Sequence, residues 1–127
     1  MPADRTSNNQ EKGARGEDLA AAYLEGKGFT VVERNYRAKR GEIDLICRHI
    51  QHGRVVLVFV EVKMRRGVAF GRPEEAVDAR KQVRMEAAAE AYLHLRGLGE
   101  VDCRFDVVGI LAGEPPRIRH FVDVFGL

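Results

Sequence analysis

Three ionisable side chains near the ends of two neighbouring β-like runs carry the chemistry that this sequence offers. Asp44 lies within residues 41–48, and Glu61 and Lys63 close the apolar run 55–63. Side chains alternate between the two faces of a strand, so Glu61 and Lys63 share one face. If the two runs pair as antiparallel strands, Asp44 lies near Glu61 on that shared face. Charged groups at the end of an apolar strand are costly to desolvate without partners, which indicates a site.

These residue types predict phosphodiester hydrolysis. Two close carboxylates repel each other, and a cation relieves the repulsion. Lys63 supplies one positive charge, and the oxygen ligands Asp44 and Glu61 suit a hard divalent ion, Mg²⁺ or Mn²⁺. Such an ion acidifies a bound water and shields a phosphodiester, while Lys63 positions or stabilises the hydroxide. Glu17, on the inner face of a predicted helix, would act as an outer ligand or orient water. The alternative is a structural salt bridge between Lys63 and one of the two acids.

Two stretches of basic residues adjoin these strands and predict contacts to a polyanion. The net charge of +2 decides little, because affinity for a polyanion depends on where the charges lie. No helix-turn-helix pattern is visible, so we expect recognition of shape, as in branched or structured DNA, over base readout. The residues expected to contact nucleic acid are Arg34, Arg37, Lys39, Arg40, Arg65, Arg66, Arg72, Lys81 and Arg84.

The elements that position these residues follow from the spacing of apolar side chains. A helix is predicted over residues 9–27, with Glu17 on its buried face, and a second from Pro73 to about residue 95. Strands are predicted over 29–35, 42–48, 55–63, 103–111 and 118–125. We therefore expect an α/β fold, a mixed sheet of about five strands flanked by two long helices. It would form one domain over residues 9–127, after a flexible lead of residues 1–8.

Length and composition exclude several classes of protein. The 127 residues are 45% hydrophobic and 31% charged, as in ordinary soluble domains. Two cysteines, Cys47 and Cys103, are too few for a disulfide scaffold and lack the spacing of a zinc site. The longest apolar run, residues 55–60, is far below the about 20 residues that cross a bilayer. We expect a cytoplasmic protein without a membrane partner.

Other polar residues are expected to have structural roles. The histidines at positions 49, 52, 94 and 120 show no ligand spacing and are assigned to loops or the surface. Asp106 lies inside a hydrophobic strand and is expected to pair with Arg104 or with the second helix.

Six segments span nearly the whole chain: Gly13–Ala20, Arg34–Arg37, Gly41–Ile46, Phe59–Arg65, Phe70–Gly71 and Arg104–Val108. Together they resemble the YraN family of bacterial proteins. That family is similar to restriction-endonuclease-like folds with a PD-(D/E)xK site, and most closely to archaeal Holliday-junction resolvases. The resemblance implies a core site of Asp44, Glu61 and Lys63, with Glu17 matching the helix-borne acid of the resolvases. Ile43 stands where the motif has a proline before the aspartate.

The resemblance implies a metal-dependent, structure-selective DNA endonuclease that acts like a Holliday-junction resolvase. It also implies a homodimer, because a symmetric junction needs two cuts. Some relatives within the fold keep the scaffold and bind nucleic acid without cutting it. The alternative function is therefore a non-catalytic nucleic-acid-binding protein, in which Lys63 neutralises the two acids. A purely structural partner protein is a third possibility.

Overall fold

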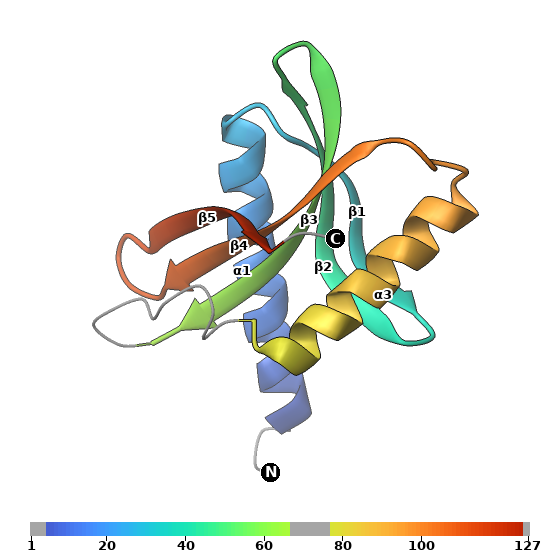
Figure 1. The fold of residues 1–127 in the computed structure, drawn as a ribbon. Helices are drawn as coiled ribbons and strands as arrows, with labels where there is room; N and C mark the ends of the chain where they lie inside the picture. The colour runs from blue at the N-terminus through green and yellow to red at the C-terminus, as the bar shows by residue number, and fades with distance from the viewer. Residues whose placement is uncertain (1–4, 67–76, 126–127) are drawn as a thin grey trace.

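Two long helices lie on opposite faces of a five-stranded sheet (Figure 1). The computed structural model describes the backbone of residues 5–66 and 77–125, and the side chains of residues 13–66 and 77–125. Within these ranges the elements confirm the predicted α/β class, with its mixed five-stranded sheet and two helices. They are α1 (Arg5–Gly26), β1 (Thr30–Ala38), β2 (Gly41–Gln51), β3 (Arg54–Arg65), α3 (Ala79–Leu95), β4 (Asp102–Leu111) and β5 (Arg117–Phe125).

The sheet has its strands in chain order, β1 to β5, with β3 at the centre. Neighbouring strands are antiparallel except β3 and β4, which are parallel. A parallel pair needs a crossover, and the segment containing α3 provides it. The side chains of Val58, Phe59 and Val60 are fully buried, as expected for a central strand covered on both faces.

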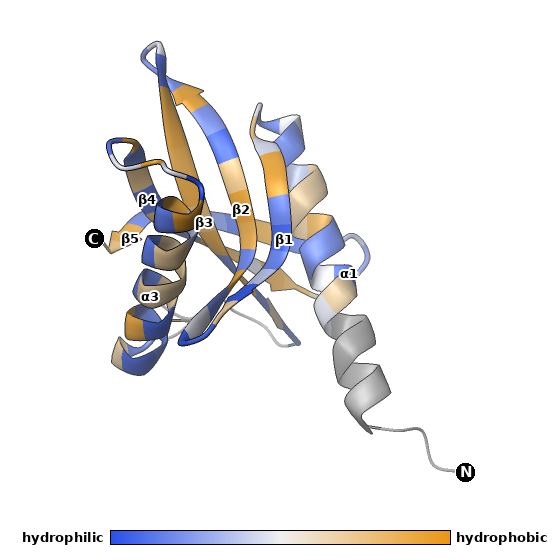
Figure 2. Cartoon of the chain, turned by 90° about the vertical axis from the view of Figure 1, so that its right-hand side faces the viewer, coloured by the Kyte–Doolittle hydropathy of each residue, from blue (hydrophilic) through white to orange (hydrophobic). Residues whose placement is uncertain are grey.

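Each helix packs its apolar side chains on its own side of the sheet, which gives two separate cores. On the α1 side, Ala20 and Leu24 pack with Leu45 and Val58. On the α3 side, Met85, Ala88, Ala89 and Tyr92 pack with Ile46, Phe59 and Phe105. Figure 2 shows hydrophobic residues concentrated in the central strands between the two helices. One face of the sheet therefore packs against α1 and the other face against α3.

Both helices begin at residues other than those predicted. The helix α1 begins at Arg5, earlier than the predicted start at residue 9. The predicted start of the second helix at Pro73 lies outside the described residues, but Val77 and Asp78 are not helical and α3 begins at Ala79. The side chain of Asp78 caps the helix by accepting the backbone N–H of Lys81 at 2.8 Å. Aspartate is a favourable N-cap residue, which explains the later start.

A buried carboxylate, Asp106, joins β4 to β5. It accepts hydrogen bonds from the Arg104 guanidinium at 3.1 Å and from the backbone N–H of Asp123 at 2.9 Å. His120 Nε2 lies 2.7 Å from its other oxygen. The predicted pairing with Arg104 is thus present, whereas His120, expected in a loop or at the surface, lies in β5 with only 7% of its side chain exposed.

Gly41, the first residue of β2, lies directly beneath α3. A Cβ atom placed on Gly41 would be 1.8 Å from the carbonyl oxygen of Arg84, well inside the contact distance of real atoms. Glycine is therefore required here for the close approach of two backbones. The contact fixes α3 against β2 one turn after Lys81.

We predict that Gly41→Ala destabilises the protein by about 1–3 kcal/mol, because α3 must move away from β2 to admit the methyl group. Chemical denaturation monitored by circular dichroism measures the change. Gly99→Ala is the matched control, since a Cβ on Gly99 would meet no atom within 4 Å. Equal stability of the two variants would contradict the close contact.

Candidate active site

Strands β2 and β3 separate where the predicted acids lie. Their pairing ends at Leu45 opposite Val60, and the side chain of Asp44 enters beyond that point, where Oδ2 accepts the backbone N–H of Val62 at 2.8 Å. The alternation of side chains in β2 breaks at the same place. Ile43 packs on the α3 side, whereas strict alternation predicted that it would share a face with Leu45. Asp44 thus lies between the two strands.

Glu61 lies beside Asp44, so the structure brings together the two carboxylates that the sequence paired. The side chain of Glu61 is 4% exposed and lies within hydrogen-bonding reach of the Asp44 carboxyl group. Burial, followed by the negative charge of Asp44, raises the pKa of Glu61 to about 7. Burial also raises the pKa of Asp44, against the Val62 hydrogen bond and the charge of Lys81. The pair therefore holds a proton more readily than two exposed carboxylates would.

The cation at this pair comes from α3. Lys81 Nζ forms an ion pair with Glu61 Oε1, and the charge of Lys81 also acts on Asp44. Burial lowers the pKa of Lys81, but the hydrogen bond and charge of Glu61, together with Asp44, outweigh it, so the pKa is raised and the amine stays protonated. Sequence reasoning assigned Lys81 to phosphate contacts and missed this pairing.

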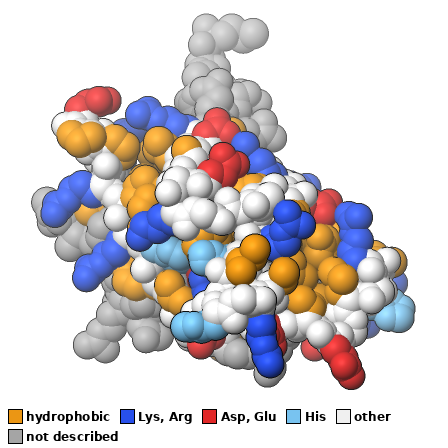
Figure 3. Space-filling model, turned by 90° about the horizontal axis from the view of Figure 1, so that it is seen from above, with side chains coloured by type: hydrophobic (Ala, Val, Ile, Leu, Met, Phe, Trp, Pro, Cys, Tyr) orange, Lys and Arg blue, Asp and Glu red, His pale blue; other side chains and the backbone are white. Residues whose placement is uncertain are grey.

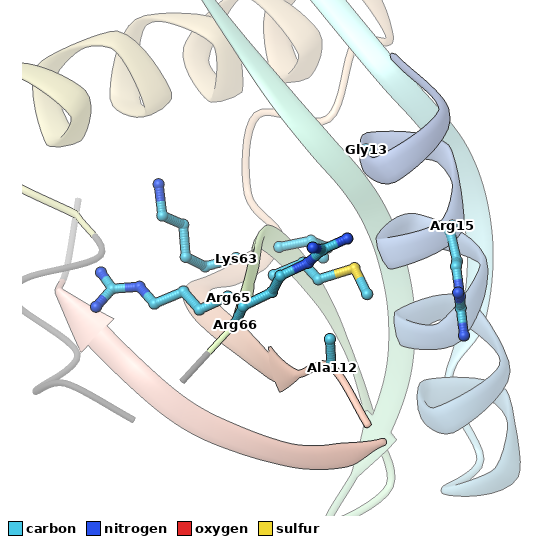
Figure 4. Close-up of a pocket in the computed structure, with 8 residues that line it drawn as sticks. Gly13, Arg15, Lys63, Arg65, Arg66 and Ala112 are labelled. Carbon is cyan, nitrogen blue, oxygen red and sulfur yellow. The ribbon is translucent and has the colours of Figure 1, made fainter. Parts of the chain in front are cut away.

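Lys63 lies apart from the two acids. Its side chain is exposed, and among the described residues it makes no ion pair. The alternation of β3 was predicted correctly, and Figure 4 shows the Lys63 side chain extending away from α1. The catalytic role predicted for Lys63 stays a prediction.

Glu17 approaches Asp44 from the α1 side. Its carboxylate accepts a hydrogen bond from Asn35 Nδ2 at 2.9 Å and lies 3.8 Å from the guanidinium of Arg34. Burial raises the pKa of Glu17, the Asn35 hydrogen bond opposes this, and the charge of Asp44 adds to it. Asn35 has a φ of 53°, a conformation that asparagine tolerates better than most residues. That backbone turn lets Asn35 reach α1 while Tyr36 packs on α3.

The predicted basic residues gather near one end of the sheet. Because β2 and β3 are antiparallel, the β1–β2 turn and the end of β3 lie at the same end. Three of these residues contact acids: Lys81 pairs with Glu61, Arg34 is 2.6 Å from Asp18, and Arg37 is 3.8 Å from Glu42. Lys39 and Arg40 are exposed in the β1–β2 turn, Arg65 ends β3, and Arg66 follows it. Arg84 lines a small pocket of about 50 Å³ with Lys81, and Arg72 lies outside the described residues.

The opposite end of the molecule, which carries the β2–β3 turn, has a different distribution of charge. Figure 3 shows that Lys and Arg side chains on this face are interspersed with acidic and hydrophobic ones and form no single patch. The two ends of the sheet therefore differ in how they would meet a polyanion.

The carboxylate pair fits a hard divalent cation as a site of two ligands. Across the described residues, no group of three or more His, Cys, Asp and Glu side chains could hold a metal ion. Mg²⁺ retains several waters and is held by one or two carboxylates together with substrate phosphates. Asp44 and Glu61 are adjacent oxygen donors of the kind that Mg²⁺ prefers.

Comparison with known proteins shows the family. The model of uncharacterised protein family UPF0102 matches residues 16–110, which include Glu17, Asp44, Glu61 and Lys81. The chain belongs to this family. A UPF0102 protein of Geobacter sulfurreducens is 44% identical over all of this chain and 98% of its own length. Another, from Rhodococcus jostii, is 45% identical over 94% of this chain and 99% of its own. The resemblance to the YraN family is thereby confirmed.

In the ranges that the structure describes, this UPF0102 protein has no helix both long and apolar enough to cross a membrane.

We predict that the stability of this UPF0102 protein falls as pH rises from about 4.5 to about 7 in the presence of a chelator. The pKa of Glu61 rises from an ordinary 4.5 to about 7 on folding, so the folded state binds the proton more tightly than the unfolded state. The stability that this proton contributes is fully present below pH 4.5 and is lost as pH rises through about 7.

Denaturant titrations across this range measure the effect in the wild type and in Glu61→Gln. The glutamine variant should lose this part of the slope, because it has no proton to release. Glu90→Gln, which removes an exposed carboxylate from α3, serves as the control. An identical slope in all three proteins would show that Glu61 titrates normally.

Proposed function

We propose that this protein is a metal-dependent, structure-selective DNA endonuclease that hydrolyses phosphodiester bonds at Asp44 and Glu61. The observation that carries the proposal is the convergence of the buried Glu61 and the partly buried Asp44 with the ammonium of Lys81 at the point where β2 and β3 separate. Burial and the charge of Asp44 raise the pKa of Glu61, and groups with shifted pKa values cluster at functional sites. The basic residues at the same end of the sheet support binding to nucleic acid.

The residues of the chain would divide the work of hydrolysis. Asp44 is oriented by the Val62 N–H, and with Glu61 it would hold Mg²⁺ or Mn²⁺, which acidifies water and stabilises phosphate charge when bound. Oxygen from water forms the new bond to phosphorus, the bond to the leaving oxygen breaks, and that oxygen takes up a proton. Lys81 would stabilise the negative charge that develops on the phosphate, because its amine stays protonated. Glu17 would orient water from the α1 side.

One observation favours a non-catalytic nucleic-acid-binding protein as the second candidate. Lys81 already forms an ion pair with Glu61, and this pair supplies part of the positive charge that two carboxylates require. A protein of this kind would use the basic end of the sheet for binding and would keep the acids as a structural pair. The two functions differ in whether the acids bind a divalent cation.

Calorimetry with Mn²⁺ and cleavage assays on branched and linear DNA test the proposal. We expect Mn²⁺ to bind the wild type, and Asp44→Asn to lose both that binding and cleavage. Binding of Mn²⁺ without cleavage of any DNA would favour the second candidate. Failure of the wild type to bind Mn²⁺ would overturn the proposal.

The two lysines can be separated by kinetics. Lys81→Met should lower kcat on the order of a hundredfold to a thousandfold, because it removes a charge at the reacting phosphate. Lys63→Met should raise KM instead. Glu90→Gln, far from the acids on the exposed side of α3, is the control for folding and activity. The reverse outcome, with kcat lost in Lys63→Met alone, would return the catalytic role to Lys63.

A further inference from the structure

A pocket of about 470 Å³ lies where the end of β3 meets α1. Four cationic side chains contribute to its lining, three of them at the end of β3 or just after it. Lys63, Arg65 and Arg66 come from this strand end, and Arg15 comes from α1. Figure 4 shows Lys63 and Arg65 extending away from α1, whereas Arg66 extends towards it. The positive charges therefore surround the end of the strand.

Contacts with α1 and with the residue after β4 hold this strand end in place. Gly16 of α1 lies against β3, so that a Cβ on it would be 3.4 Å from Met64 Cβ. The neighbouring Arg15 forms part of the lining, and Figure 4 shows its side chain running along α1. The carbonyl of Arg65 accepts the backbone N–H of Ala112 at 2.9 Å, which ties β3 to the end of β4. The cations thus project from a fixed scaffold.

The chemistry of the described lining matches a phosphodiester backbone. It contains four cations and no carboxylate. An excess of cationic side chains around one site attracts a polyanion. Arginine presents a planar set of N–H donors that suits phosphate, and three of the four cations are arginines. The rest of the lining is Gly13 with three apolar side chains, Val62, Met64 and Ala112.

The pocket lies next to the site of Asp44 and Glu61. Val62, whose N–H binds Asp44, is itself part of the lining. At about 3.3 Å per residue, the strand carries Arg65 about 13 Å beyond Glu61. That distance equals the axial rise of about four nucleotides at about 3.4 Å each.

We propose that this pocket is a subsite for the phosphate backbone of the nucleic acid, next to the bond cut at Asp44 and Glu61. The assignment rests on the proposed function for the position of the strand, but it concerns binding alone. It adds Arg15, which the sequence did not single out, and gives Lys63 a binding role.

Fluorescence anisotropy with a labelled four-way DNA junction, in a chelator that prevents cleavage, tests the subsite. The variant Arg15→Ala/Arg66→Ala removes two cations on the α1 side without altering the acids or Lys81. We expect binding to weaken on the order of tenfold. Between about 50 and 200 mM salt, the slope of log K against log salt should become shallower by roughly 0.9 for each phosphate that the variant no longer neutralises.

The control variant, Arg48→Ala/Arg54→Ala, removes the same charge from exposed positions at the other end of β2 and β3. It should keep the wild-type slope, and Arg15→Lys/Arg66→Lys should restore most of the binding. Equal weakening in the pocket and control variants would overturn the subsite, as would a wild type that fails to bind the junction. If binding behaves as expected but Mn²⁺ supports no cleavage, the hydrolytic function fails and the subsite stands.

Discussion

The hydrogen bond from the Val62 N–H to Asp44 Oδ2 sets the geometry of the functional end of the molecule. In a regular antiparallel pair, the backbones of β2 and β3 would continue their ladder past Leu45 and Val60. Here a side-chain oxygen replaces a backbone carbonyl as the acceptor, so the strands can part without leaving a buried N–H unsatisfied. The gap admits a carboxylate into the sheet itself. Every other feature of the site is arranged around that carboxylate.

The charged side chains around Asp44 come from both helices and from the sheet between them. Glu17 comes from α1, Glu61 from the central strand and Lys81 from the first turn of α3. A single layer could not surround Asp44 in this way, because the side chains of one helix reach only one face of the sheet. The separate cores beneath α1 and α3 fix the two helices independently, so the positions of Glu17 and Lys81 relative to Asp44 are set by packing. The electrostatics of the site is thus a product of the three-layer architecture.

The sequence predicted the strands and the proximity of Asp44 to Glu61, but not the ion pair between Lys81 and Glu61. The apolar run 55–63 located β3, and antiparallel pairing of its neighbour was enough to bring Asp44 near Glu61. The partner of Glu61 depends on where α3 crosses the sheet, which follows from the Gly41 contact and the Asp78 cap, and local patterns do not reveal tertiary docking. Asp78 before a helical run was a usable N-cap signal. The positive φ of Asn35 and the burial of His120 arise from contacts with other elements and had no local signal.

Synthesis from the N-terminus makes strands β1 to β3 before α3, which lies in the crossover between β3 and β4. Strands β1, β2 and β3 are joined by tight turns and can pair soon after they leave the ribosome, because their contacts are close in sequence. At that stage Glu61 has been synthesised but the lysine of α3 has not. The nascent sheet must therefore keep its central carboxyl either protonated or open to water until the crossover helix docks. Docking of α3 would be the step that gives the buried carboxyl group its positively charged partner.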